Sequence, residues 1–598
     1  MPDFISLSLY FQSVWAMVAL VIFALALLAW CAESWWLQYN KVDETEPPLA
    51  YHSSVTSWAF FGTAMSTLRR YGMRLRDVIS MTRKLTFDSS RKTGYPICTI
   101  PLLTGKAYVV GCPSTIQAFF RNRDISFAPF AIEFVDRMDV LSQAAKKAYA
   151  EGLHEAVIKT FHSTMNGASL RKMNVVALQE VARLLPGGAT EPADPQTGCQ
   201  TTSVQVEDVW VWLRDIMTIS TTTALFGKKN SPWLKHPSLV KTYWGYEAGD
   251  VSGRAPLTDL TDRRSKRDHA DLVAALYDYF HQRHDIPSPS LPGTVANEDQ
   301  GEVGLTTTKL AEIQRQVGYT ATELGATYTV VLHGALVNMV PTMFWFGMYV
   351  FTQRNLLEQL RIEVAVAVSM DRATGKNCQR NAFVNSGNID KTCPLLLSTL
   401  RETQRLVSLG TLHRRALKDT VIPGLDENGN ERSYLLKKGT AMLLSIKWNH
   451  RDPLIWGASV NDFVADRFFD GENKRQDPVG VEERVAHDDD HTGTDARNLR
   501  RKAYMPFGGG KELCPGPNFA TSEMLGTMVI LILGYDIRRK DGGVLDLPKF
   551  APPKMTQTTA RPHPGADLQA TVSRREGWED ILWSVRTHTD PETATRRT

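Results

Sequence analysis

Residues 507–516 read FGGGKELCPG, and an apolar segment follows them directly. Three consecutive glycines predict a loop, and Cys514 is the side chain of this loop best suited to bind a transition metal. Backbone N–H groups and the dipole of the helix expected behind it favour negative charge on sulfur, so we expect a lowered pKa for this thiol. The segment therefore predicts one thiolate delivered to a metal, a pattern typical of a haem-iron ligand.

Two other interpretations of this loop are available. A buried free cysteine packs well as a small hydrophobic side chain, so Cys514 could be purely structural. A phosphate-binding loop is excluded more firmly, because that motif requires Ser or Thr after its lysine and this chain has Glu512 after Lys511. A metal ligand remains the prediction, with a structural cysteine as the alternative.

Two upstream segments extend the pattern. Glu402 and Arg405 lie three residues apart in TLRETQRL, so on a helix they share a face and can pair. The segment 463–468, FVADRF, then supplies Arg467. An isolated E-x-x-R match is ordinarily an exposed ion pair of little consequence. In this order before Cys514, the motifs make the chain resemble the cytochrome P450 superfamily of haem-thiolate monooxygenases, over nearly everything after residue 90.

The resemblance implies a mainly α fold with small β-sheets (α+β), preceded by an N-terminal transmembrane helix. It implies haem b as cofactor, with Cys514 as both the catalytic axial ligand and the metal site. Phe507, Gly510 and Gly516 match the family positions that shape the loop around the cofactor.

The resemblance also assigns a structural role and a cofactor contact outside the loop. Glu402, Arg405 and Arg467 match the family's buried triad, which braces the cysteine loop. Arg414 matches an arginine that binds a haem propionate. Glu512 departs from the family pattern, because many members place a basic side chain there, and we expect it to turn outward or leave the propionate to other residues.

The segment 334–345, GALVNMVPTMFW, lies in the family's oxygen-activating helix. Where the family places an acid followed by Thr or Ser, this chain has Val337 and Asn338, and we expect Asn338 to manage distal hydrogen bonding. Pro341 removes a backbone donor and should kink the helix. This helix resembles that of the sterol 7/12-alpha-hydroxylases and prostacyclin synthase, a branch that holds both monooxygenases and an isomerase. The expected apolar pocket-lining residues are Leu332, Ala335 and Leu336.

The N-terminal segment has the character of a membrane helix. Residues 14–30 are almost purely apolar, and no charged residue occurs between Asp3 and Glu33. The missing basic start disfavours a cleaved signal peptide. Basic residues follow the segment, which by the positive-inside rule places the rest of the chain in the cytosol. We expect a single-pass protein of the endoplasmic reticulum membrane.

These features divide the chain into four parts. We predict a membrane anchor at 1–37, with its helix at about 12–36, and a linker and membrane-proximal segment at 38–90. The cytochrome P450 catalytic domain is expected at 91–585, and a disordered tail at 586–598.

The composition of the chain excludes several classes of partner and bound metal. A net charge of +4 over 598 residues argues against nucleic acid. Seven cysteines without C-x-x-C spacing exclude a disulfide scaffold and an ordinary zinc site, and suit a reducing compartment. The segment 487–491, HDDDH, is expected to be an exposed loop.

The resemblance implies an oxidoreductase acting on paired donors with incorporation of molecular oxygen. It would hydroxylate or epoxidise a lipophilic small molecule (terpenoid, sterol-like or polyketide-derived) in fungal secondary-metabolite biosynthesis. NADPH and flavins would act only through a separate NADPH-cytochrome reductase, with cytochrome b5 as a further electron donor, since the chain carries no flavin or nicotinamide signature. The alternatives are a reductase-independent isomerase or dehydratase acting on a peroxide, and a non-catalytic haem protein.

Overall fold

The computed structural model describes residues 42–48, 97–102, 105–188, 202–249, 263–287, 303–371, 380–426, 430–469, 493–551 and 557–587. The predicted anchor at 1–37, most of the linker to residue 90, the segment 487–491 and the tail after 587 lie outside these residues. The chain divides into two compact units, one of Met1–Phe127 with Leu412–Ser445 and one of Ala128–Thr411 with Ile446–Thr598.

The smaller unit is built on a five-stranded sheet with the order β1-β2-β10-β7-β3 and a separate β8-β9 hairpin. Strand β2 pairs antiparallel with β1 and parallel with β10, and its β-branched and aromatic residues are buried. Its elements are β1 (Ile97–Leu102), β2 (Gly105–Val110), α4 (Pro113–Arg121), β3 (Ile125–Ser126), β7 (Thr411–Ala416), β8 (Thr420–Leu425), β9 (Glu431–Leu436) and β10 (Ala441–Ser445).

The larger unit is mainly helical. In its first half the elements are α5 (Ala128–Asp136), α6 (Gln143–Ala148), η1 (Tyr149–Leu153), α7 (His154–Thr164), α8 (Gly167–Leu184), β4 (Ser203–Val206), α9 (Val209–Phe226), α10 (Pro232–Lys235), α11 (Leu239–Ala248), α13 (Arg263–His281), α14 (Leu305–Gln316), α15 (Ala321–Leu336), α16 (Met339–Phe351) and α17 (Arg354–Val364). In its second half they are η2 (Ala365–Ala367), β5 (Val368–Met370), β6 (Arg380–Asn385), α18 (Ile389–Thr392), α19 (Pro394–Val407), α20 (Ile446–His450), α21 (Pro453–Trp456), α22 (Gly493–Ala503), η3 (Gly510–Glu512), α23 (Pro517–Gly534), β11 (Tyr535–Arg539), β12 (Ala570–Arg574) and β13 (Ile581–Arg586).

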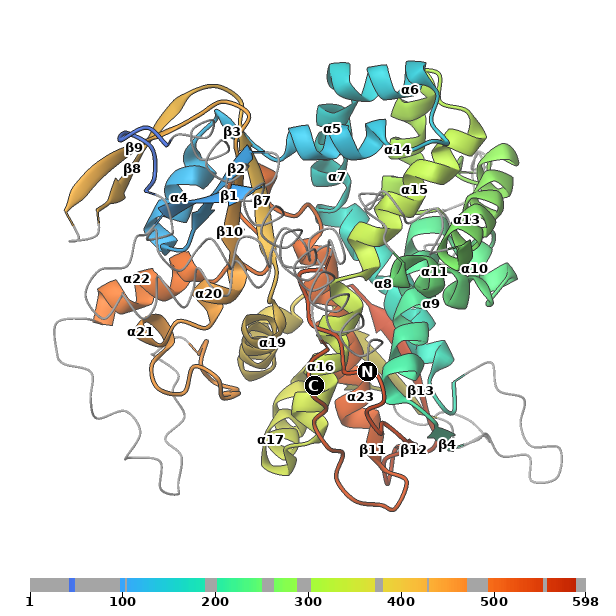
Figure 1. Cartoon of the computed structure of the whole chain (residues 1–598). Helices are drawn as coiled ribbons and strands as arrows, with labels where there is room; N and C mark the ends of the chain where they lie inside the picture. The colour runs from blue at the N-terminus through green and yellow to red at the C-terminus, as the bar shows by residue number, and fades with distance from the viewer. Residues whose placement is uncertain are drawn as a thin grey trace, which may run out of the picture. The chain divides into compact units, whose positions relative to one another are not determined.

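The core of the larger unit forms around two largely apolar helices, α16 and α23. Helices α8, α9, α16 and α23 pack against one another (Figure 1). Nearly every residue of α16 is buried, as expected for a helix without a polar face. Helix α23 begins three residues after Cys514 and is fully buried from Glu523 to Gly534, so the cysteine loop leads into the core through the first turns of this helix.

Two three-stranded sheets complete the unit, with the orders β11-β12-β4 and β13-β6-β5. Helices with small sheets are the architecture predicted from the sequence. Among the described residues, Ala321–Phe351 (α15 and α16) is long and apolar enough to cross a membrane, but most of it is buried in protein, as in the core helix of a globular domain.

Candidate active site

The loop that carries Cys514 is closed by backbone hydrogen bonds. The Cys514 N–H donates to the Phe507 carbonyl at 3.0 Å, and the Gly508 N–H donates to the Met505 carbonyl at 3.1 Å. Gly508 and Gly510 have φ angles of 76° and 71°, in the left-handed region that favours glycine. The glycines at these two positions are therefore required by the path of the loop.

The last residues of the motif start helix α23. Gly516 is the N-cap of this helix and Pro517 occupies its first turn, where a missing N–H costs nothing. The φ of Gly516 is −107°, and a Cβ there would meet the Met165 sulfur at 3.5 Å, an ordinary contact. The chain alone therefore does not require glycine at 516.

Burial controls the protonation of Cys514. Burial raises the pKa of the thiol above its ordinary value, and the hydrogen bond from the Gly516 N–H lowers it by less. The expectation that the helix terminus would lower this pKa was therefore wrong for the polypeptide by itself, because removing the thiolate from water costs more than one backbone donor returns. A metal bound to the sulfur would hold it deprotonated.

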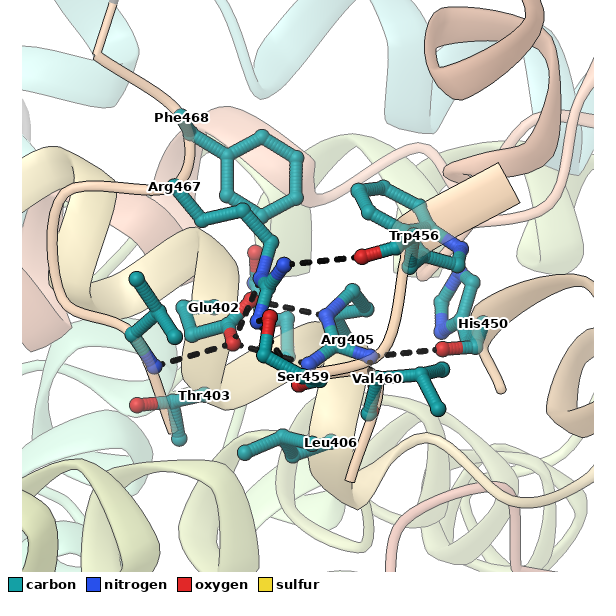
Figure 2. Close-up of polar contacts among 12 residues, drawn as sticks. Glu402, Thr403, Arg405, Leu406, His450, Trp456, Ser459, Val460, Arg467 and Phe468 are labelled. Atoms are coloured by element: carbon teal, nitrogen blue, oxygen red, sulfur yellow. Dashed lines mark hydrogen bonds and ion pairs between the residues drawn. The ribbon is translucent and has the colours of Figure 1, made fainter. Parts of the chain in front are cut away.

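Glu402, Arg405 and Arg467 lie together in the core of the larger unit (Figure 2). Arg405 makes two parallel hydrogen bonds to Glu402, Nε to Oε2 at 2.7 Å and NH2 to Oε1 at 2.8 Å. Arg467 Nε donates to Glu402 Oε1 at 2.9 Å, and so does the Val464 N–H at 3.1 Å. Both side chains of the Glu402–Arg405 pair are fully buried.

The two guanidinium groups use their remaining donors on backbone carbonyls. Arg405 NH1 donates to the carbonyls of His450 (2.7 Å) and Val460 (2.8 Å). Arg467 donates to the carbonyls of Trp456 (3.1 Å) and Ser459 (2.9 Å). The cluster thus joins α19 to the chain between residues 450 and 467, and Figure 2 shows these contacts.

His450 connects this cluster to the cysteine loop, a link not predicted from the sequence. Its carbonyl accepts from Arg405, while its ring Nε2 accepts the Met505 N–H at 3.0 Å. Burial lowers the pKa of His450 to about 3, and the nearby Arg405 charge acts in the same direction. The ring is therefore neutral at physiological pH, as an accepting Nε2 requires.

The helix break expected at Pro341 lies just before it. Helix α15 ends at Leu336, α16 begins at Met339, and Pro341 cannot donate to the Val337 carbonyl. Val337 is fully buried, and Asn338 is half-buried. The Asn338 side-chain oxygen accepts from the Thr558 N–H (3.1 Å) and hydroxyl (2.7 Å) and from the Thr559 N–H (3.3 Å).

The two faces of α15 differ in packing. Leu332 and Leu336 are fully buried in the core, so the expectation that they line an open pocket was wrong. Gly334 is exposed, and a methyl group added there would meet nothing within 4 Å. Ala335 is half-buried between these faces. Near the end of α15 the accessible position is therefore Gly334, and the half-buried Asn338 follows beyond the helix end as the N-cap of α16.

Two further sequence positions are placed as follows. Arg414 lies on β7 in the smaller unit, is 6% exposed, and stacks over the Phe120 ring at 5.8 Å. Glu512 is half-buried in the larger unit, and its charge raises the pKa of His154, although burial of that ring lowers it by more. His154 also bonds through Nδ1 to the Tyr149 hydroxyl at 2.9 Å. Glu512 thus faces α7, where the sequence indicated no partner.

The residues of the larger unit fit a haem group. Cys514 is a free cysteine on a short loop before a helix N-terminus, and thiolate is a recognised axial ligand of haem iron. The open face of α15, with no side chain at Gly334, suits the close approach of a flat ring. Among the described residues no cluster of three or more His, Cys, Asp or Glu offers a competing metal site.

Comparison with known proteins agrees with this geometry. A sequence model of the family "Cytochrome P450" matches residues 75–558. A "Cytochrome P450 monooxygenase" of Gibberella zeae is 28% identical over 91% of both chains. The "25-hydroxycholesterol 7-alpha-hydroxylase" of Rattus norvegicus is 28% identical over 39% of this chain and 54% of its own. The solved structure "Retinoic acid bound cyanobacterial CYP120A1" covers 80% of this chain and 92% of its own at 16% identity, with a TM-score of 0.52, which supports the fold alone.

Proposed function

Since this chain belongs to the cytochrome P450 family, we propose that it is a monooxygenase that hydroxylates or epoxidises a lipophilic small molecule at a membrane surface. The observation that carries the proposal is the Cys514 loop, closed on Phe507 and tied through Met505 and His450 to the buried Glu402–Arg405–Arg467 cluster. This arrangement fixes one sulfur at the start of a buried helix.

The cofactor is haem b, and electrons come from NADPH through a separate reductase. When bound, haem supplies the activation of molecular oxygen. Cys514 would hold the iron through sulfur, and Phe507, Gly510 and Gly516 would shape the loop on that side. Arg414 would neutralise a propionate. The Glu402–Arg405–Arg467 cluster would brace the loop through His450 without touching substrate.

The proposed substrates are terpenoid, sterol-like or polyketide-derived molecules. Support comes from two sources: the helix of Val337, Asn338 and Pro341 resembles that of sterol hydroxylases, and a relative is named for 25-hydroxycholesterol. The similarity to a protein of the fungus Gibberella zeae over 91% of both chains supports a fungal role, proposed here as secondary-metabolite biosynthesis.

We place the protein in the endoplasmic reticulum membrane, held by the predicted helix at about 12–36, with the catalytic domain in the cytosol. An NADPH-cytochrome reductase and cytochrome b5 would then be partners. The exposed Arg501, in the last turn of α22, is a candidate contact for an acidic partner.

The central test is spectroscopic. The reduced full-length protein in the presence of carbon monoxide should show the strongly red-shifted Soret band of thiolate-ligated haem, and Cys514→Ala should abolish it. Cys393→Ala is a matched control, because Cys393 is a buried cysteine at the start of α19 and is not part of the 507–516 loop. This substitution should leave the Soret band unchanged. A band that survives Cys514→Ala would overturn the assignment.

One observation favours a second candidate, a reductase-independent isomerase or dehydratase acting on a peroxide. Val337 is apolar and buried, and the Asn338 oxygen is occupied, so neither side chain can relay a proton as an acid. Product formation with and without added reductase and NADPH separates the two. Turnover of a peroxide substrate without reductase would replace the monooxygenase proposal.

A further inference from the structure

Asn166 and Gly167 form an exposed Asn-Gly pair at the start of α8. Such pairs can lose ammonia spontaneously, because the backbone nitrogen that follows asparagine attacks the side-chain amide, and glycine has no Cβ to obstruct ring closure. The φ angle of Gly167 is +61°, and a Cβ there would meet no atom within 4 Å. No described residue packed at this position therefore restricts the approach of the Gly167 nitrogen to the Asn166 side chain.

The Gly167 nitrogen is also activated by its place in the fold. It is the first N–H of α8, so no earlier turn of the helix supplies a carbonyl for it, and it donates to no described residue. The positive end of the helix dipole favours loss of a proton from this N–H. Because Gly167 is exposed, hydroxide from solvent can remove that proton.

The Asn166 amide is held in one orientation. Its Nδ2 donates to the His162 carbonyl at 2.6 Å, near the end of α7, and a carbonyl oxygen can only accept. Its Oδ1 therefore faces Asn518, which donates through Nδ2 at 2.9 Å from the first turn of α23. A donor at this oxygen draws electron density from Cγ and stabilises the negative charge that develops on the oxygen during attack.

We propose that Asn166 is a site of spontaneous deamidation, with Gly167 as the nucleophile and Asn518 as the donor that polarises the amide. The deprotonated Gly167 nitrogen forms a bond to Cγ, the Cγ–Nδ2 bond breaks, and Nδ2 takes up a proton from water and departs as ammonia, which leaves a five-membered succinimide. Water then opens either carbonyl–nitrogen bond of the ring and gives aspartate or isoaspartate. The reaction gains water, loses ammonia and needs no oxidant or reductant. It goes beyond the proposed function and does not depend on it.

The product adds negative charge where two helices begin. Its carboxylate would lie at the N-cap of α8 and beside Asn518 in α23, the helix that begins three residues after Cys514. Aspartate is favoured at an N-cap, and the dipoles of both helices favour negative charge there. Isoaspartate instead adds a further backbone carbon atom before α8 and should loosen its first turn.

The first test is peptide mapping by mass spectrometry of the haem-loaded, full-length protein during incubation at mildly alkaline pH. Deamidation appears as the mass gain from replacement of NH2 by OH, and protein isoaspartyl methyltransferase labels isoaspartate. Asn166 should be modified while the half-buried Asn385-Ser386 pair stays intact, because the Ser386 N–H donates to the Arg586 carbonyl at 3.0 Å. An unmodified Asn166, or equal modification at Asn385, overturns the proposal.

The second test isolates Asn518, with Asn428-Gly429, the other Asn-Gly pair of the sequence, as an internal reference. Asn518→Ala should slow modification of Asn166 relative to Asn428 roughly two- to tenfold, the effect of losing one hydrogen bond. Asn388→Ala is the matched control, because it removes another exposed asparagine at the start of a helix, α18, and should leave the ratio unchanged. In urea the wild type and both variants should give the same ratio. An unchanged ratio in folded Asn518→Ala overturns the role assigned to Asn518.

Discussion

Two groups of polar side chains in the larger unit differ in how fully their hydrogen bonds are satisfied. Around Glu402 they satisfy one another: both carboxylate oxygens accept from guanidinium groups, whose other donors bind backbone carbonyls. At the junction of α15 and α16, the Asn338 side-chain oxygen accepts three hydrogen bonds from Thr558 and Thr559, while its NH2 group donates to no described residue. The comparison teaches that a buried ion-pair cluster can satisfy its polar groups internally, whereas a polar side chain at a helix break is held through one end only.

The largest effect is expected at the saturated cluster. Glu402→Ala leaves two buried guanidinium groups without a counter-charge and should cost about 3–5 kcal/mol in the free energy of unfolding. Glu312→Ala is the matched control, since Lys309 and Glu312 have the same i,i+3 spacing at about half exposure and should lose less than about 1 kcal/mol. Urea unfolding measures both. Similar losses would show that burial does not distinguish the two pairs.

Glu523 sharpens the comparison, as a buried carboxyl with hydroxyl partners instead of arginine. It lies on α23, accepts from Ser220 (2.8 Å) and Thr221 (2.9 Å), and burial raises its pKa to about 7. A raised carboxyl pKa favours the neutral form, so stability should fall as pH rises from about 4.5 to 7 and then level off. The free energy of unfolding of Glu523→Gln should therefore exceed that of the wild type by on the order of 3 kcal/mol at pH 8 and by almost nothing at pH 4.5.

Denaturant unfolding across this pH range tests that prediction, with Glu312→Gln as an exposed control. A gain for Glu523→Gln that is equal at both ends of the range would show that the carboxyl does not titrate in the folded protein.

His450 should give a pH dependence of the opposite sign. Its folded pKa of about 3 lies below the ordinary value of about 6.5. The contribution of the neutral His450 ring to the free energy of unfolding is complete above about pH 6.5 and is lost as the pH falls toward 3. Between pH 7 and 5 the wild type should lose about 2 kcal/mol that His450→Gln does not lose. Parallel pH–stability curves for the two proteins would contradict a neutral His450 that accepts from Met505.

The smallest effect is expected on the open face of α15. Gly334→Ala should raise the free energy of unfolding of the haem-free protein by about 0.5–1 kcal/mol, because alanine favours a helix and the added methyl meets no protein atom. Gly526→Ala in α23 is the matched case in the packed core, where a Cβ would lie 2.4 Å from the Leu178 side chain, and should cost about 1–3 kcal/mol. Thermal unfolding of the two haem-free variants measures both effects. Destabilisation by Gly334→Ala would mean that the Gly334 face of α15 is packed against other atoms.

Much of the larger unit could be predicted from the sequence because its signals are local. The run of glycines predicted a loop at 507–516, and the positive φ angles of Gly508 and Gly510 agree with it. Pro517 lies in the first turn of α23, where proline is favoured. The pairing of Glu402 with Arg405 follows from helical spacing. The pocket-lining roles of Leu332 and Leu336 failed, because hydrophobicity alone does not say which apolar face of a helix meets the core.

By itself, the sequence determined the family, the cysteine loop and the residues of the buried ion-pair cluster, since short motifs encode backbone shape and ligand chemistry. Tertiary structure alone decided which protonation state burial favours at Cys514, the link from His450 to Met505 and the direction of the Asn338 amide. Those properties depend on atoms 55 residues away for His450 and 220 for Asn338. Desolvation and hydrogen-bond geometry exist only after folding has brought such distant segments together.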